Sequence, residues 1–175
     1  MTLIVCPLRD VALEMTRSKP ARLISLLGPE QEAPRTPPGV SRLTLRFHDI
    51  PEPRLGLIAP DRIMIADLLA FGAAWSEPAP LLVHCWMGVS RSPAAALVLA
   101  CAADPSRDEG DIALALRRVS PCATPNPLVV ALADDLLGRE GRLVAAAASI
   151  GRGAETSRGE TFRLAARPGS RRGMD

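Results

Sequence analysis

The sequence predicts an α/β fold in which a mostly parallel central sheet is flanked by helices. Short apolar segments of strand composition alternate with longer segments of helical periodicity, as a parallel sheet covered by helices requires. The segment LLVHC (residues 81–85) is apolar almost throughout rather than alternating, which is typical of a strand buried on both faces of its sheet. With 175 residues, the chain is long enough to form one domain with a sizeable core.

Four segments are expected to form strands, because each is a short apolar or alternating run bounded by turn residues. These segments are residues 2–6, 21–28, 42–47 and 81–85. The first ends at Pro7, and the third, RLTLRF, alternates polar and apolar side chains. Ligands of α/β proteins bind beyond the carboxyl ends of the strands, so residues that follow these segments are candidates for a site.

Six segments are expected to form helices, and they are residues 9–19, 61–75, 92–103, 108–120, 127–138 and 141–151. Asp61 is suited to cap the second of them, and Ser92 with Pro93 has the composition of an N-cap followed by the first helical residue. The third segment, SPAAALVLACAA, is apolar nearly all round. We therefore expect it to be a central buried helix.

Arginine is concentrated at the end of the chain. Residues 151–175 contain six arginines against two glutamates and one aspartate, and basic polar segments of this kind are usually disordered. We therefore expect one domain over residues 1–150, followed by an Arg/Gly-rich disordered tail over residues 151–175. A contact with acidic partners is the alternative for this tail.

The composition argues against several classes of protein. A net charge of +2, two tryptophans, three phenylalanines and no tyrosine do not make a nucleic-acid surface. The longest apolar run, residues 93–103, is shorter than the about 18 residues of a membrane span. The four cysteines and two histidines lack metal-ligand spacing, and the N-terminus lacks the pattern of a signal peptide. We therefore expect a cytoplasmic monomer with free thiols and no metal, membrane or nucleic-acid partner.

The segment HCWMGVSRS (residues 84–92) concentrates reactive side chains where a predicted strand ends and a predicted helix begins. In such a loop, backbone N–H groups can converge on an anion, supported by the positive end of the helix dipole. Gly88 permits the tight turn, and the planar guanidinium of Arg91 can bind two oxygens of a phosphate group. The segment therefore predicts a pocket for a tetrahedral oxyanion.

Cys85 lies in the same positive field, which favours the thiolate, the nucleophilic form of cysteine. A thiolate that faces a bound phosphate points to covalent catalysis through a phosphocysteine. We expect Ser92 to donate its hydroxyl to the sulfur and His84 to order the loop by hydrogen bonds. A buried, inert cysteine is the alternative for Cys85, whereas Ser90 lacks the GxSxG context of a serine nucleophile.

A strand, HCx5R[S/T] and a helix form the motif of the cysteine-dependent protein tyrosine phosphatases, and HCWMGVSRS most resembles that of the dual-specificity branch. The order of LTLRFHDI, LLVHC and LRRVSPCATPN is similar too, so the resemblance extends over residues 1–138. It implies a phosphotyrosine protein phosphatase-like fold and, without a cofactor, hydrolysis of phosphomonoesters through a phosphocysteine. It also implies that the phosphate is bound by Trp86, Met87, Gly88, Val89, Ser90 and Arg91.

Cleavage of a phosphate ester also needs a proton for the leaving oxygen, normally from a carboxyl group on a loop. Asp49 follows a predicted strand and precedes a proline-rich segment, and the resemblance puts the family's general acid at this position. Asp61 is the other candidate, although a role as helix cap accounts for it, and His48 is a substitute donor. The resemblance further implies that Asn126 assists near the catalytic loop, with an ordinary turn or helix cap as the alternative.

The loop departs from the family at Met87, which is preceded by Trp86, because the family usually has a small residue before the glycine. Residues 86–90 contain no lysine or arginine, which disfavours polyphosphorylated inositol lipids as substrates. The chain also has no tyrosine to form the aromatic wall of the tyrosine-specific branch. We therefore expect a protein tyrosine or dual-specificity phosphatase whose substrate is a phosphorylated protein or a small phosphomonoester. A catalytically weak module that binds phosphate and captures phosphorylated partners is the alternative.

Overall fold

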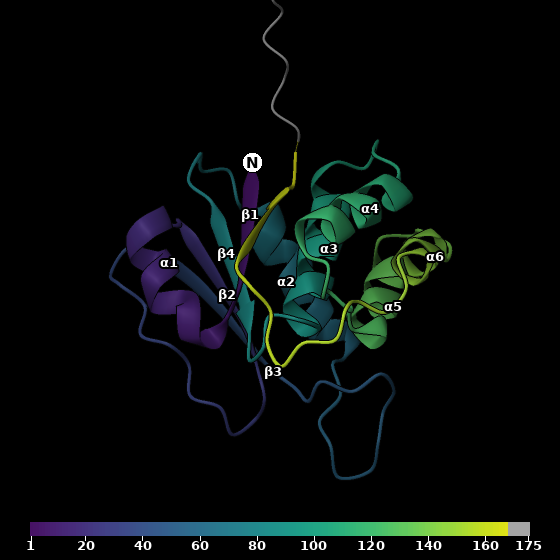
Figure 1. Cartoon of the computed structure of the whole chain (residues 1–175), viewed down its shortest axis with the longest axis horizontal. Helices are drawn as coiled ribbons and strands as arrows, with labels where there is room; N and C mark the ends of the chain where they lie inside the picture. Colours follow the sequence, from purple (N-terminus) through teal and green to yellow (C-terminus); the bar gives the residue numbers. More distant parts are fainter. Residues whose placement is uncertain (168–175) are drawn as a thin grey trace, which may run out of the picture.

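A five-stranded sheet lies between one helix on one face and five on the other in the computed structural model, which describes residues 1–167 (Figure 1). The strands are β1 (Thr2–Pro7), β2 (Arg22–Leu27), β3 (Ser41–Arg46), β4 (Leu81–Cys85) and β5 (Phe162–Ala165). They are arranged in the order β3-β2-β4-β1-β5. The first four run parallel, and only β5 is antiparallel to its neighbour. The predicted α/β fold with a mostly parallel sheet is therefore confirmed.

The central strand β4 places Cys85 at the carboxyl edge of the sheet. Cys85 is opposite Pro7 of β1 on one side and Leu26 of β2 on the other. All five residues of β4 are buried, as the continuous apolar run predicted for a strand covered on both faces. The chain that leaves β4 therefore enters the region where α/β proteins bind ligands.

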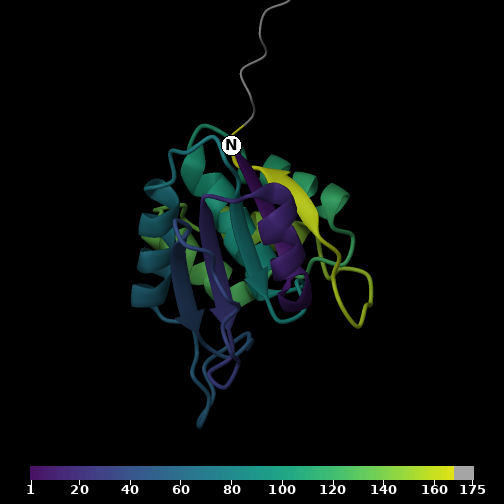
Figure 2. The same cartoon turned by 90° about the vertical axis from the view of Figure 1, so that its left-hand side faces the viewer.

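Each of the six helices expected from the sequence is present. They are α1 (Val11–Ser18), α2 (Arg62–Ala73), α3 (Arg91–Ala103), α4 (Glu109–Val119), α5 (Pro127–Leu136) and α6 (Arg142–Ser149), with a 3₁₀ turn at Leu8–Asp10 before α1. Figure 1 shows α1 on one side of the sheet and α2 to α6 on the other, and Figure 2 shows α1 lying over the face of the strands. The two faces have separate apolar cores, of which the one under α1 is the smaller.

Helix α3 is the central helix of the larger core. Every residue from Arg91 to Cys101 is buried, and the alanines of this stretch allow the helix to lie close to both the sheet and its neighbouring helices. The expectation of a central buried helix is confirmed. Because α3 starts directly beyond the loop that follows Cys85, its position also determines where that loop can lie.

The start of α3 differs from the sequence-based expectation. The N-cap is Ser90 rather than Ser92, and Arg91 is the first helical residue. Pro93 is consequently the third helical residue, where the missing N–H removes no hydrogen bond because the first four N–H groups of a helix have no intrahelical acceptor. Ser92, placed inside the first turn, has its hydroxyl free for another partner.

The expectation of a disordered tail from residue 151 is wrong for residues 162–165. These residues form β5, which pairs with β1 through Val5↔Phe162 and Leu3↔Leu164. Phe162 and Leu164 are buried, and the residues between and after them are exposed, which is the two-residue period of an edge strand. The high arginine content of residues 151–175 favoured disorder in the sequence-based prediction and outweighed this four-residue alternation. Residues 168–175 of the expected tail lie outside the described residues.

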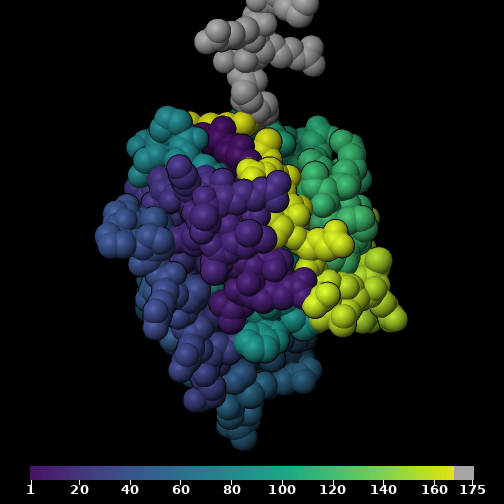
Figure 3. Space-filling view, turned by 60° about the vertical axis from the view of Figure 1, so that its left-hand side comes forward, coloured from purple at the N-terminus to yellow at the C-terminus, as the bar shows by residue number. Residues whose placement is uncertain are grey.

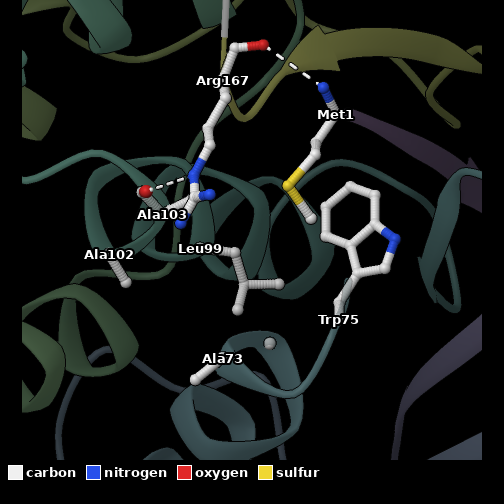
Figure 4. A pocket seen from close by; sticks show the side chains of 8 residues that line it. Met1, Ala73, Trp75, Leu99, Ala102, Ala103 and Arg167 are labelled. Atoms are coloured by element: carbon white, nitrogen blue, oxygen red, sulfur yellow. Dashed lines mark hydrogen bonds between the residues drawn. The ribbon is translucent and has the colours of Figure 1, made fainter. Parts of the chain in front are cut away.

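A small cavity of about 150 Å³ lies at the opposite end of the strands from Cys85 (Figure 4). It is lined by Met1, Gly72, Ala73, Trp75, Leu99, Ala102, Ala103 and Arg167. Arg167 donates from Nε to the Ala103 carbonyl at 2.6 Å, and its own carbonyl accepts from the Met1 amino group at 3.4 Å. These bonds attach the segment after β5 to the end of α3 and to Met1.

Among the helices of residues 1–167, none is both long and apolar enough to span a membrane.

Candidate active site

The β4–α3 loop, residues 86–90, is held in place by hydrogen bonds that its carbonyl groups accept. Four of these carbonyls accept hydrogen bonds from segments around the loop. The pairs are Leu8 N with Trp86 O at 3.3 Å, Gly159 N with Met87 O at 2.8 Å, Thr124 N with Val89 O at 2.8 Å and Ala94 N with Ser90 O at 3.0 Å. Within residues 1–167, the only N–H of the loop that donates to a protein acceptor is that of Gly88, to the Cys85 sulfur. The loop thus keeps its donors available to an anion.

Gly88 provides the conformation that this arrangement needs. Its φ is +73°, in the left-handed region that residues with a Cβ rarely adopt. A Cβ atom at this position would also lie 2.9 Å from the backbone nitrogen of Pro7 and 3.2 Å from the carbonyl carbon of Cys6. Both distances are below ordinary van der Waals contact with backbone that cannot move easily. The turn between Cys85 and α3 therefore requires glycine at position 88.

Two donors point at the sulfur of Cys85. The Ser92 hydroxyl lies 3.1 Å from Sγ, and the Gly88 N–H lies 3.2 Å from it. Cys85 is buried, and it lies at the N-terminal end of α3, where the helix dipole favours negative charge. Hydrogen bonds to a sulfur are strongest when it is a thiolate. The Ser92 hydroxyl and the Gly88 N–H thus hold the sulfur of Cys85 at the base of the loop.

The guanidinium of Arg91 is buried close to the loop. Nη1 donates to the Phe47 carbonyl at 3.0 Å, and the group lies 5.9 Å from the centre of the Phe47 ring. Nε is 3.8 Å from Asp49 Oδ2 and makes no hydrogen bond within residues 1–167. An unpaired buried donor is costly unless a ligand satisfies it. Together with the open N–H groups of the loop, this donor suits an oxyanion.

The carboxyl group of Asp49 is held against the far end of the loop. Its Oδ1 accepts from the Ser90 hydroxyl at 2.7 Å and from Asn126 Nδ2 at 2.8 Å. Its Oδ2 lies 3.8 Å from Arg91 Nε. Asp49 belongs to the segment that follows β3. Only β2 separates β3 from β4 in the sheet, so the segments that follow these two parallel strands lie at the same edge, close to each other. Asp49 is therefore positioned beside the oxyanion pocket.

Asn126 has both of the roles considered for it. Its Oδ1 accepts from the Val129 N–H at 3.0 Å and so caps α5, while its buried Nδ2 donates to Asp49 Oδ1 and, at 3.1 Å, to the Ile50 carbonyl. The backbone N–H of Asn126 further donates to Ser90 O at 3.3 Å. One side chain thus links α5, the segment of Asp49 and the loop.

The two alternative proton donors, Asp61 and His48, are hydrogen-bonded to other segments. Asp61 caps α2 by accepting from the Met64 N–H at 2.8 Å, which is the structural role expected for it. The ring Nδ1 of His48 accepts from the Ile58 N–H at 2.9 Å, and the backbone N–H of His48 donates to the Ile58 carbonyl at 2.7 Å. His48 therefore closes the base of the loop between β3 and α2, and Asp49 is the carboxyl group that reaches the pocket.

His84 is buried beneath the site and is uncharged. Its Nε2 lies 2.7 Å from the hydroxyl of Ser25, its register partner on β2. Burial lowers the pKa of His84 to about 4, because the positive form would lose its hydration. His84 thus joins β4 to β2 directly behind the cysteine. Ser25 was not singled out from the sequence, and the signal for it is its polar side chain within the otherwise apolar strand LISLL.

The other three cysteines are free, as Cys85 is. Burial raises the pKa of Cys101 to about 12 and that of Cys6 further, so both remain thiols at neutral pH. Among residues 1–167 there is also no group of three or more side chains suited to holding a metal ion.

The structure brings together Cys85, Arg91, Ser92 and Asp49 around one loop. The Trp86 and Met87 side chains lie exposed, so their contribution to the pocket is through the backbone.

No protein-family model and no curated protein matches the chain. Solved structures are similar to it in fold. They include human DUSP28, at 19 % identity over 79 % of this chain and 89 % of that one, with a TM-score of 0.60. DUSP15 has 19 % identity over 88 % and 94 % of the two chains, with a TM-score of 0.61. The Yvh1 phosphatase domain from Chaetomium thermophilum has 18 % identity over 81 % and 93 %, with a TM-score of 0.56.

These similarities cover most of both chains and bear out the resemblance that the HCx5RS motif indicated. The chain has the α/β fold of the dual-specificity phosphatases.

Proposed function

We propose that the protein is a phosphomonoester hydrolase, a protein tyrosine or dual-specificity phosphatase that acts through a phosphocysteine. One observation carries this proposal. The sulfur of Cys85 accepts hydrogen bonds from Ser92 and Gly88 and faces a loop whose remaining N–H groups donate to no protein acceptor within residues 1–167. The buried Nε of Arg91, 3.8 Å from Asp49 Oδ2, also makes no hydrogen bond within these residues. A nucleophile under an oxyanion pocket is the arrangement that phosphoryl transfer to sulfur needs.

In the first step, the Cys85 thiolate attacks the phosphorus atom while the bond from phosphorus to the leaving oxygen breaks. The loop N–H groups and Arg91 bind the three equatorial oxygens, on which charge is spread. Asp49 donates a proton to the leaving oxygen. Because Asp49 Oδ1 is occupied by Ser90 and Asn126, the proton would be carried on Oδ2. The products are an alcohol or phenol and a phosphocysteine.

In the second step, a water molecule attacks the phosphocysteine and the phosphorus–sulfur bond breaks. Asp49, now a carboxylate, accepts a proton from the water, so inorganic phosphate leaves and the carboxyl group is restored. The electron pair of the broken bond returns to Cys85 as a thiolate, which the Ser92 hydroxyl stabilises. Acid and base are the same group in opposite steps, as microscopic reversibility requires.

The proposed chemistry also has consequences for the redox environment and the number of copies that the reaction needs. The nucleophile is required as a free thiolate, so we infer a reducing, cytoplasmic environment. All of the groups named above come from one chain, so a single copy is sufficient for the reaction. The substrate would be a phosphorylated protein, with small aryl phosphates as test substrates.

Turnover of p-nitrophenyl phosphate tests the proposal. We expect vanadate-sensitive hydrolysis by the protein and by Cys122→Ser, a matched variant of a free cysteine that takes no part in the proposed chemistry. Cys85→Ser should lose turnover and still bind phosphate. Phosphate binding without any turnover by the unmodified chain would instead support the binding module that captures phosphorylated partners.

A further inference from the structure

A groove of about 320 Å³ lies directly beside the β4–α3 loop. Its walls come from three segments that are far apart in the sequence. They are the end of β1 with the turn after it (Pro7, Leu8 and Arg9), the loop (Trp86 and Met87) and the segment before β5 (Ser157 and Arg158). In Figure 3 the purple N-terminal part, a teal segment and the yellow C-terminal part lie next to one another on the lower part of the molecule.

The groove combines apolar walls with positive charge at its edge. Trp86 is 55 % exposed and Met87 is 37 % exposed, although side chains of this size and kind are usually covered. Their backbone N–H groups are the part that the proposed chemistry uses, so that chemistry does not account for the side chains. Arg9 and Arg158 add two exposed guanidinium groups. Arg9 also pairs with Asp10 at 3.2 Å, so Arg158 is the stronger attractor of an anion.

The groove and Asp49 lie at opposite ends of the loop. Trp86 and Met87 directly follow Cys85, whereas Asp49 is bonded to Ser90 at the other end. A phosphoryl group over the loop N–H groups would therefore have the acid on one side and the groove on the other. Residues that flank a phosphorylated side chain on one side only would reach the groove.

The C-terminal wall of the groove is fixed to the loop. The Gly159 N–H donates to the Met87 carbonyl at 2.8 Å, and a Cβ atom at Gly159 would lie 2.8 Å from the Gly88 carbonyl oxygen. This close approach holds the neighbouring Ser157 and Arg158 near Trp86. On the other wall, the Leu8 N–H donates to the Trp86 carbonyl at 3.3 Å. The groove is thus preformed, which reduces the entropic cost of binding.

We propose that this groove is a specificity subsite which binds an apolar residue and an acidic residue on one side of the phosphorylated residue of a protein substrate. The proposal rests on the proposed phosphatase function. The arginines complement a carboxylate, and the apolar walls match an aliphatic side chain. A small metabolite would need an enclosing pocket that buries most of its surface, whereas the exposure of Trp86 and Met87 leaves this groove open to an extended chain.

Hydrolysis of three phosphotyrosine peptides tests the subsite. One has Gly and Asn on both sides of the phosphotyrosine, the second has Leu and Asp on the N-terminal side, and the third has Leu and Asp on the C-terminal side. We expect kcat/KM to be higher by about two- to fivefold for one of the two acidic peptides, within the range that exposed ion pairs provide. Arg158→Ala should remove most of this preference, and Arg118→Ala, on the exposed side of α4, should retain it.

A charge exchange makes the test sharper. Arg158→Glu should prefer a peptide in which Lys replaces the Asp of the favoured sequence. Equal hydrolysis of all three peptides, equal preference for both acidic peptides, or a preference that survives both Arg9→Ala and Arg158→Ala would overturn the subsite. In each of these outcomes the peptides are still hydrolysed. Failure of the unmodified protein to hydrolyse any of them, or p-nitrophenyl phosphate, would instead overturn the proposed function.

Discussion

Asn126 donates from Nδ2 to Asp49 Oδ1 at 2.8 Å and accepts at Oδ1 from the Val129 N–H at 3.0 Å. The position of the Asp49 carboxyl group is therefore coupled to the start of α5, although the two residues are 77 positions apart in the sequence. The same carboxyl oxygen accepts from Ser90 at the end of the β4–α3 loop. Asn126 and Ser90 together determine which oxygen of Asp49 is left for proton transfer.

Two substitutions of Asn126 should separate its roles. Asn126→Ser keeps an oxygen that can cap the Val129 N–H but loses the donor to Asp49 without adding a charge, so kcat should fall by about 10- to 100-fold while the helix cap is retained. Asn126→Ala loses the cap as well, and the free energy of unfolding should fall further by about 1 kcal/mol. Steady-state kinetics and denaturant unfolding measure the two effects. An Asn126→Ser variant with full activity would show that Asp49 does not depend on this bond.

Asp49→Asn should slow poor leaving groups much more than good ones. General acid catalysis contributes about 10²- to 10⁴-fold, and a leaving group that needs no proton loses little of this. The measurement is the dependence of kcat/KM on the pKa of the leaving phenol in a series of aryl phosphates, which should become steeper in the variant. Asp61→Asn is the matched control, because asparagine also caps a helix. Equal slowing across the series would point to another acid.

Gly88→Ala should disrupt the oxyanion pocket. The added Cβ would approach the backbone of Pro7 to 2.9 Å in a left-handed conformation, so the loop N–H groups must move. We expect a loss of kcat/KM of about 10²-fold or more, as for removal of an oxyanion donor, and loss of thermal stabilisation by phosphate. Gly138→Ala is the control, because Gly138 has φ +61° but no atom within 4 Å of its added Cβ. Similar losses in both variants would attribute the effect to backbone strain alone.

Burial of His84 should make the fold sensitive to acid. The unfolded chain binds a proton near pH 6.5, whereas folded His84 stays neutral until about pH 4, so protons favour the unfolded state as the pH falls through this window. The difference between the two pKa values corresponds to roughly 3 kcal/mol of stability. Denaturant unfolding between pH 7 and pH 4 should show this loss in the unmodified protein and a smaller one in His84→Gln. Parallel curves for the two proteins would contradict it.

The sheet, the helices and the β4–α3 loop could be predicted because each depends on local patterns. The apolar run at residues 81–85, the HCx5RS spacing and the small residues of α3 are all readable along the chain. The cap at Asp61 was predictable for the same reason. Two features were not, since they depend on contacts between distant segments. Strand β5 is only four residues long and is stabilised by pairing with β1.

The start of α3 is the second such feature. Ser92 has the composition of an N-cap, but its hydroxyl is bonded to the Cys85 sulfur, and the helix begins earlier at Arg91. Ser92 thus contacts the Cys85 sulfur in place of the N-cap role that its local sequence favours. Likewise, no spacing along the chain reveals that Asp49 Oδ1 is shared by Ser90 and Asn126, because that geometry arises from the order of β3, β2 and β4.

Trapping of the covalent intermediate tests the proposed chemistry most directly. Asp49→Asn removes the base of the second step, so with p-nitrophenyl phosphate, a good leaving group, the phosphoenzyme should accumulate. After an acid quench, peptide mass spectrometry should find one added phosphoryl group on the peptide that contains Cys85, and none in a variant that also carries Cys85→Ser. Turnover with no phosphoryl group on Cys85, or a phosphoryl group on another residue, would contradict the covalent mechanism.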